Sequence, residues 1–168
     1  MAFTLYQATI PPVVQMLAAL SAILDQAAAY CEERKIDPSV LIGYRLAPDM
    51  FPFSRQIQVV SDQAKGIAAR LSGVEVPSYD DTEASFAELK GRLAKTLDFI
   101  KSIAPAKFEG GERREVQLRL RGQDVTFTGE RYAINFALPN LYFHAATAYD
   151  ILRHNGVPLG KADFLGVT

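Results

Sequence analysis

The feature that most constrains the fold is a helical repeat of apolar residues in three long segments. Residues 13–31, 53–71 and about 82–103 each carry apolar side chains three or four positions apart. A helix with such a stripe has one apolar face, which is stabilised by packing against another element. The chain is therefore expected to fold as a bundle of long helices around a single core.

Capping residues and prolines predict where the first helices begin. Thr9 is the expected N-cap of the first long helix, because Pro11 and Pro12 would then lie in its first turn, where a missing N–H costs little. A short helix is expected after Asp37, which combines an N-cap with Pro38 at the first helical position. Each long helix should therefore have a defined start.

The second and third long helices also have recognisable ends. Gly73 is expected to end the second helix as a C-cap glycine. The third helix is expected to begin either at Asp80, which matches a capping box with Glu83, or at Thr82. Pro105 should end this third helix, since proline cannot continue a regular helix.

Residues 115–121 and 124–128 alternate strictly between polar and apolar side chains, which predicts a β-hairpin before the last helix. The apolar face of this hairpin carries Val116, Leu118, Leu120, Val125 and Phe127. An isolated hairpin is only marginally stable in water. This face is therefore expected to pack on the helices.

The last helix is expected to run to about His154 and to stop at Asn155-Gly156. A helical segment from about residue 131 precedes it, and Pro139 either kinks that segment or starts a new helix. Residues 157–168 are predicted to be irregular, with Leu159, Phe164 and Leu165 against the bundle. The predicted fold is thus all-α, an up-and-down four-helix bundle with a small β-hairpin inserted before the last helix, in one domain of residues 1–168.

Composition narrows the class of protein. The chain has 168 residues, of which 49% are hydrophobic, and this suits one domain with a substantial core; the net charge of −1 gives no sign of nucleic-acid binding. The lone cysteine, Cys31, excludes an internal disulfide and favours a reducing, cytoplasmic location. The most apolar stretch, residues 13–31, is interrupted by Gln15, Asp25 and Gln26, so a core helix is expected there rather than a membrane span.

Both histidines of the chain, His144 and His154, lie in the last helix. His144 falls on the side expected to face inward, where an imidazole can bind a ligand, act as a base or be satisfied by one hydrogen bond. His154 lies in the last turn, where a cation interacts favourably with the helix C-terminus. Asp62 and Gln58 share one helix face, and they meet His144 in one pocket if that face turns inward; otherwise Asp62 pairs with Lys65 on an exposed edge.

Two further residues belong to this candidate pocket. Asn140 lies one turn before His144, and Tyr142 offers an aromatic ring with a polar tip that suits a pocket wall, a subunit interface or the core. Cys31 continues an apolar stripe and is expected to be a buried structural residue rather than a nucleophile. The sequence contains no Gly-rich phosphate loop, no Gly-x-Ser-x-Gly, no His-Glu-x-x-His and no Cys-x-x-Cys.

Several short runs resemble a known family. They are residues 47–52 (APDMFP), 73–77 (GVEVP), 137–140 (ALPN) and 148–157 (AYDILRHNGV), together with Phe143-His144. These runs are similar to an uncharacterised bacterial family catalogued as a domain of unknown function and grouped with the DinB/YfiT-like four-helix bundles. The resemblance covers nearly the whole chain, and it implies a bundle fold and a homodimer without an established activity.

The DinB/YfiT-like group often binds a divalent metal through three histidines, two of them four residues apart on the last helix. In this chain the positions four residues before and after His144 are Asn140 and Ala148, so the resemblance implies neither a metal site nor another cofactor. The function expected first is a ligand-binding or non-catalytic bundle protein that associates with itself and binds no nucleic acid and no membrane. The alternative is a DinB-like, metal-dependent transferase or hydrolase centred on His144.

Overall fold

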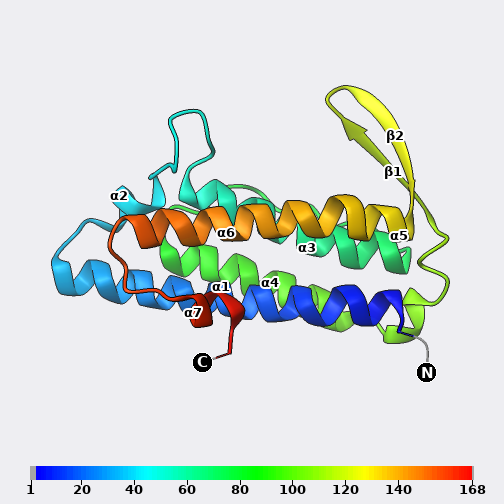
Figure 1. The fold of residues 1–168 in the computed structure, drawn as a ribbon, viewed down its shortest axis with the longest axis horizontal. Helices are drawn as coiled ribbons and strands as arrows, with labels where there is room; N and C mark the ends of the chain where they lie inside the picture. The colour runs from blue at the N-terminus through cyan, green and yellow to red at the C-terminus, as the bar shows by residue number, and fades with distance from the viewer. Residues whose placement is uncertain (1–2, 168) are drawn as a thin grey trace.

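Long helices make up most of the molecule (Figure 1). The structure is a computed structural model, and it describes residues 3–167. The four longest are α1 (Leu5–Arg34), α3 (Phe53–Ser72), α4 (Phe86–Ser102) and α6 (Leu138–His154). The shorter elements are α2 (Pro38–Ile42), the 3-10 helix η1 (Pro105–Phe108), β1 (Glu115–Leu120), β2 (Gln123–Thr128), α5 (Gly129–Tyr132), the π-helical turn η2 (Ala133–Ala137) and α7 (Lys161–Leu165). Because α3 packs on both α6 and α4, and α1 packs on α4, the apolar faces share one core. The prediction of a mainly helical fold with one small hairpin is confirmed.

Helix α1 begins one turn earlier than the sequence pattern suggested. Thr4 is its N-cap and forms a capping box with Gln7, so Pro11 and Pro12 lie inside the helix. The predicted N-cap, Thr9, is buried and donates its hydroxyl to the carbonyl oxygen of Leu5. The prediction was wrong because prolines usually mark a first turn, whereas here two reciprocal hydrogen bonds at Thr4 stabilise an earlier start.

The directions of α3 and α4 correct the expected up-and-down order. Phe53 at the start of α3 packs edge-on against Phe86 at the start of α4, with ring centroids 6.0 Å apart. Farther along, the hydroxyls of Ser61 and Thr96 lie 2.8 Å apart, so the two helices run parallel. Between α3 and α4, residues 73–85 bring the chain back to the end of the molecule where α3 begins. Thirteen extended residues reach about 40 Å and α3 is about 30 Å long, so this connection can cross the whole helix.

Helix α4 begins at Ser85, whose hydroxyl accepts from the backbone N–H of Glu88. The capping box predicted at Asp80 and the alternative at Thr82 are therefore both wrong. Glu83 does not cap a helix, because its carboxylate binds Arg92 instead. At the other helix ends the predictions hold: Asp37 caps α2, and Gly73 ends α3 with a φ of 75°.

The hairpin has the predicted strands, and Val116 pairs with Phe127 at its base. Its two turn residues, Arg121 and Gly122, both have positive φ, as a tight hairpin turn requires. The Phe127 ring lies against Phe136, with centroids 5.7 Å apart. Beyond this base the hairpin projects away from the helices (Figure 1), so the expected packing of its whole apolar face is confirmed only at the base.

The last helix continues through Pro139 without a break. Helices α5 and α6 are joined by the π-helical turn η2, in which the N–H of Leu138 donates to the carbonyl oxygen of Ala133. Proline has no N–H to donate to the fourth residue before it, and the wider turn just before Pro139 accommodates that loss. Helix α6 then ends as predicted, with Gly156 at a φ of 92°.

The tail forms more structure than was predicted. Residues 161–165 make α7, a short helix that lies along α1 (Figure 1). Leu159 is buried and the ring of Phe164 packs edge-on against Tyr149, as expected. Leu165, however, is 43% exposed, so only part of the apolar tail covers the core.

Helix α1 is long and apolar enough to cross a membrane by length and composition alone. Its most apolar window of 18 residues has a mean hydropathy of 1.5, and 50% of that window is buried inside the molecule. Val13, Leu17 and Leu20 are fully buried against the other helices. A core helix of a globular protein has the same properties, and α1 occupies such a position here.

Candidate functional site

His144 is held by hydrogen bonds that connect α6 to α3 and to Phe51, two residues before α3 begins. Its Nδ1 lies 2.6 Å from Oε1 of Gln56, and Nε2 of Gln56 donates to the carbonyl oxygen of Phe51 at 3.0 Å. Because the amide nitrogen is used for Phe51, the amide oxygen is the acceptor, and Nδ1 of His144 is assigned the proton. In the neutral ring, the lone pair is therefore on Nε2.

The surroundings of His144 favour this neutral form. Burial lowers the pKa of His144, and the positive charge of Arg55 lowers it further. An ordinary histidine titrates at about 6.5, so a lowered pKa leaves the imidazole uncharged at pH 7. The site therefore offers a neutral hydrogen-bond acceptor with a fixed orientation.

Two partly exposed aromatic rings flank His144. Phe51 stacks on the imidazole with centroids 6.3 Å apart and planes tilted by 21°, and Phe143 meets it edge-on at 5.2 Å. Phe51 is 50% exposed and Phe143 is 57% exposed, so both rings offer apolar surface to the solvent beside the imidazole. The Arg55 guanidinium lies 5.8 Å from the centre of the Phe51 ring. Together these residues form a surface with two apolar rings, the Nε2 acceptor of His144 and the guanidinium of Arg55, which we call the His144 site.

Asp62, the predicted acidic partner of His144, is bound to other residues in the structure. Asp62 lies 2.9 Å from both Nη2 of Arg92 and Nζ of Lys65, and Gln58 donates to Glu83 at 2.9 Å. These bonds direct Asp62 and Gln58 toward α4 and residues 73–85, rather than toward α6. The pairing of Asp62 with Lys65 matches the simpler alternative, although Lys65 is buried and not at an exposed edge.

Gln56 is the residue that sequence reasoning missed. It lies two residues before Gln58, and two residues of helix turn the side chain by about 200°. Gln56 therefore faces α6 while Gln58 faces the opposite side, and both are buried because α3 has neighbours on both sides. The sequence held one sign of this residue: Gln56 is polar but lies directly before Ile57, a member of the apolar stripe of this helix.

The other two predicted site residues, Asn140 and Tyr142, both lie on α6 but have different surroundings. Asn140 is half-buried one turn before His144, and no hydrogen bond joins the two side chains in the part of the chain that the structure describes. Tyr142 lies on another face of α6 and lines a hollow of about 260 Å³ with Met16 and Phe164. Burial raises the pKa of Tyr142, so its hydroxyl stays protonated.

A second polar group, the Arg92 cluster, consists of Arg92, Asp62, Asp81 and Glu83. The Arg92 side chain is 1% exposed, and its guanidinium lies 2.9–3.0 Å from all three carboxylates. Burial alone would raise the pKa of Glu83, but hydrogen bonds from Arg92 and Gln58, together with the charge of Arg92, bring it below the ordinary value. These ion pairs tie residues 73–85 to α3 and α4.

The donor set around His144 does not fit the three-histidine metal site of the DinB/YfiT-like group. The neighbouring side chains on α3 and α6 that carry an oxygen donor include the amides of Gln56 and Asn140, and one imidazole with amide oxygens is a poor ligand set for zinc or nickel. Within residues 3–167, no group of three or more His, Cys, Asp or Glu side chains is arranged to hold a metal ion.

The lone cysteine is a core residue. Cys31 is 1% exposed in the apolar face of α1. Burial raises the pKa of its thiol, and the negative charge of Asp37 raises it further. A protonated, covered thiol is a poor nucleophile, which agrees with the structural role expected from the sequence.

Comparisons with other proteins agree on a family. The crystal structure of a DinB family member protein from Shewanella denitrificans superposes with a TM-score of 0.90; it is 43% identical, and the match covers 98% of this chain and 93% of that one. No curated protein matches the sequence. Residues 5–165 match a family described as a domain of unknown function, DUF1993. The chain therefore belongs to the DUF1993 family, within the DinB-like group.

Proposed function

We propose that this protein is a non-catalytic, ligand-binding member of the DinB/YfiT-like four-helix bundles, and that His144 binds the ligand. The observation that carries the proposal is the neutral imidazole whose Nδ1 is held by Gln56, which leaves Nε2 as an oriented acceptor. A core histidine needs only one satisfied hydrogen bond. The second nitrogen, beside two half-exposed rings, is better explained by a ligand than by packing.

The chemistry of the site suggests the class of ligand. The rings of Phe51 and Phe143 suit a planar, apolar group, and Nε2 of His144 suits an O–H or N–H donor on that group. The Arg55 guanidinium is paired with Asp81, so its charge is partly balanced and does not by itself favour an anionic ligand. We infer a small, neutral, aromatic molecule with one hydrogen-bond donor.

A binding role fits these contacts better than catalysis. In Ser-His-Asp catalysis a carboxylate holds Nδ1 of the histidine and stabilises the imidazolium that forms. The predicted candidate, Asp62, is bound to Arg92 and Lys65, and the neighbour of His144 is the neutral amide of Gln56. The proposal therefore assigns His144 to recognition.

The first prediction tests this assignment with a matched pair of probes, indole and 1-methylindole. Indole should shift the Nε2 signal of His144 in nitrogen-15 NMR spectra and bind about fivefold more tightly, because only indole can donate a hydrogen bond worth about 1 kcal/mol. His144→Ala should abolish this difference between the probes. The variant should also lower the free energy of unfolding by about 1–3 kcal/mol, because it leaves the buried Oε1 of Gln56 unpaired.

His154→Ala is the control for that experiment, since His154 is exposed in the last turn of the same helix. It should leave the indole preference unchanged and alter stability by about 0.5 kcal/mol. Equal binding of the two probes to the wild type would contradict the proposal. A preference for indole that survives in His144→Ala would place the acceptor elsewhere and would also contradict it.

The second prediction is that the protein is a homodimer in the cytoplasm. Support comes from the exposed apolar side chains Val40 and Leu165, which do not belong to the His144 site, and from a hairpin that projects beyond the helices, since exposed apolar surface often marks a subunit contact. Sedimentation equilibrium at micromolar concentration should give about twice the chain mass of 18.5 kDa. A mass of one chain at that concentration would refute self-association.

A further inference from the structure

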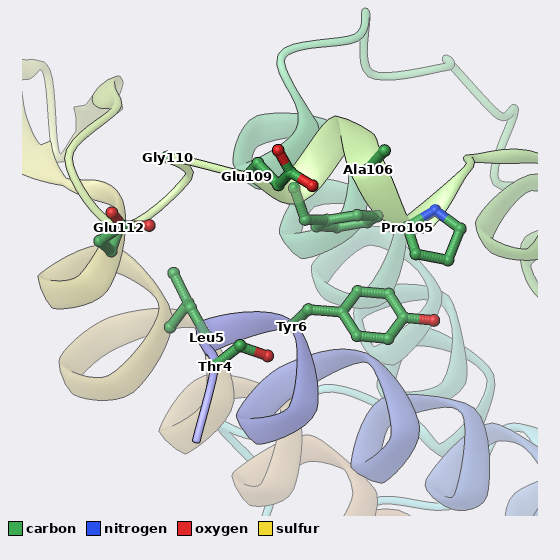
Figure 2. A pocket seen from close by; sticks show the side chains of 9 residues that line it. Thr4, Leu5, Tyr6, Pro105, Ala106, Glu109, Gly110 and Glu112 are labelled. Carbon is green, nitrogen blue, oxygen red and sulfur yellow. The ribbon is translucent and has the colours of Figure 1, made fainter. Parts of the chain in front are cut away.

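A groove lies beside the N-terminus of α1, away from the residues of the His144 site. Its first part has a cavity volume of about 450 Å³. Figure 2 shows Leu5 and Tyr6 of α1 on one side of this space and Pro105 of η1 on the other. A volume of this size can hold a small organic molecule.

The groove continues past the first turn of α1. A second hollow of about 570 Å³ shares Thr4, Leu5 and Glu112 with the first and extends to Ile134. The two hollows therefore adjoin along the start of α1. We call the combined space the N-terminal groove.

Apolar and aromatic side chains line much of the N-terminal groove. The rings of Tyr6 and Phe108 pack edge-on with centroids 5.0 Å apart. At the other end, Phe3 is 77% exposed and Ile134 is 45% exposed. A ligand with an apolar body would cover these surfaces and remove them from water.

The charged residues that line the groove are all acidic. Glu109 and Glu112 line the first hollow, and Glu112 and Glu130 line the second; among the lining residues that the structure describes, none is Lys, Arg or His. The backbone N–H of Glu130 donates to the carbonyl oxygen of Glu112 at 3.0 Å, which fixes these two residues next to each other. Arg113 lies 2.7 Å from one carboxylate oxygen of Glu112, but its own side chain is 81% exposed.

We propose that the N-terminal groove binds a small organic cation with an apolar body, of the alkylammonium class. Its charge complements the three carboxylates, and its body complements Leu5, Tyr6 and Phe108. Aromatic rings add to the attraction, because a cation interacts favourably with the face of a tyrosine or phenylalanine ring. This site is independent of His144 and of the function proposed for it.

A different role for the carboxylates is electrostatic support of α1, because negative charges stabilise the positive N-terminal end of a helix. That role requires no ligand and predicts no preference for a cation. The two explanations therefore differ in the affinity of charged and neutral probes.

The experiment uses three probes with the same six-carbon chain: hexyltrimethylammonium, hexan-1-ol and hexane-1-sulfonate. Calorimetric titration of the untagged protein at low salt should show the ammonium binding at least about tenfold more tightly than the alcohol, and the sulfonate more weakly than both. In NMR spectra the ammonium should shift the methyl signals of Leu5 and Ile134.

The double variant Glu112→Gln/Glu130→Gln, which removes two of the three carboxylates, should lose most of the preference for the ammonium over the alcohol. Its control is Glu32→Gln/Glu33→Gln, which changes the net charge equally at the exposed far end of α1 and should keep the preference. Equal affinities of the wild type for the ammonium and the alcohol would overturn the proposal. So would a preference that persists in the groove variant, or methyl shifts confined to other parts of the molecule.

Discussion

Replacing Arg92 with alanine is expected to lower the free energy of unfolding by about 3 kcal/mol. Removing one partner of a buried ion pair costs about 3–5 kcal/mol, because the remaining charge is left without compensation. The lower end applies here, since Asp62 and Asp81 are 33% and 40% exposed and can be partly rehydrated. Glu83, at 12% exposure, cannot. Denaturant unfolding followed by circular dichroism measures the change.

The pH dependence of the stability lost in Arg92→Ala identifies the physical origin of that loss. The pKa of Glu83 is below its ordinary value in the folded protein, so its stabilising contribution is complete above about pH 4.5 and is lost as pH falls through the lowered pKa. The difference between wild type and Arg92→Ala should therefore shrink in acid. Arg113→Ala, which removes an exposed arginine paired with Glu112, should change stability by less than about 1 kcal/mol. A constant difference from pH 7 to pH 3 would show that lost packing, and not charge, explains the effect.

Gly129→Ala should also destabilise the protein by about 3 kcal/mol. A Cβ at this position would overlap the carbonyl oxygen of Gly111 and would lie 3.2 Å from Cδ2 of Leu71. Overpacking usually costs about 1–3 kcal/mol, and the upper end applies because the obstacle is backbone. That backbone cannot move freely, since the N–H of Gly111 donates to Phe108 and the N–H of Glu130 donates to Glu112.

Gly91→Ala is the matched control for Gly129→Ala. Gly91 lies within α4, and apart from the adjacent backbone of its own helix no atom lies within 4 Å of an added Cβ. Alanine is favoured over glycine inside a helix by about 0.8–1.0 kcal/mol, so this variant should be more stable than wild type. Thermal melts of both variants test the comparison. An unchanged midpoint for Gly129→Ala would show that the backbone of Gly111 moves away from residue 129 at little cost.

Local signals in the sequence were sufficient for the elements themselves. Helical apolar stripes predicted the long helices, and strict alternation predicted the hairpin, because both patterns record which side of an element is buried. Gly73, Asp37 and Gly156 were correct as end signals, since each needs only a neighbouring backbone group or a positive φ. Thr9 and Asp80 were wrong as caps because a competing cap, Thr4 or Ser85, lay within a few residues.

The candidate site was predicted less well than the elements. His144 was expected to face inward and is half-buried, and its hydrogen-bond partner is Gln56 rather than Gln58 or Asp62. Periodicity alone could not decide between the two glutamines, because α3 is covered on both sides and both residues are buried. The acidic residues of the N-terminal groove come from two separate segments, residues 109–112 and Glu130 of α5, so no local pattern in the sequence marked them as one group.

The sequence by itself determined the helical character of this protein, its hairpin and the residues of its core, since these depend on periodicity and on contacts between near neighbours. Only the tertiary structure decided that α3 and α4 run parallel, that Gln56 orients His144 and that Arg92 forms ion pairs with three carboxylates. The physical reason is the connection at residues 73–85. It is long enough to allow either direction for α4, and the direction that forms determines which side chains meet across the core.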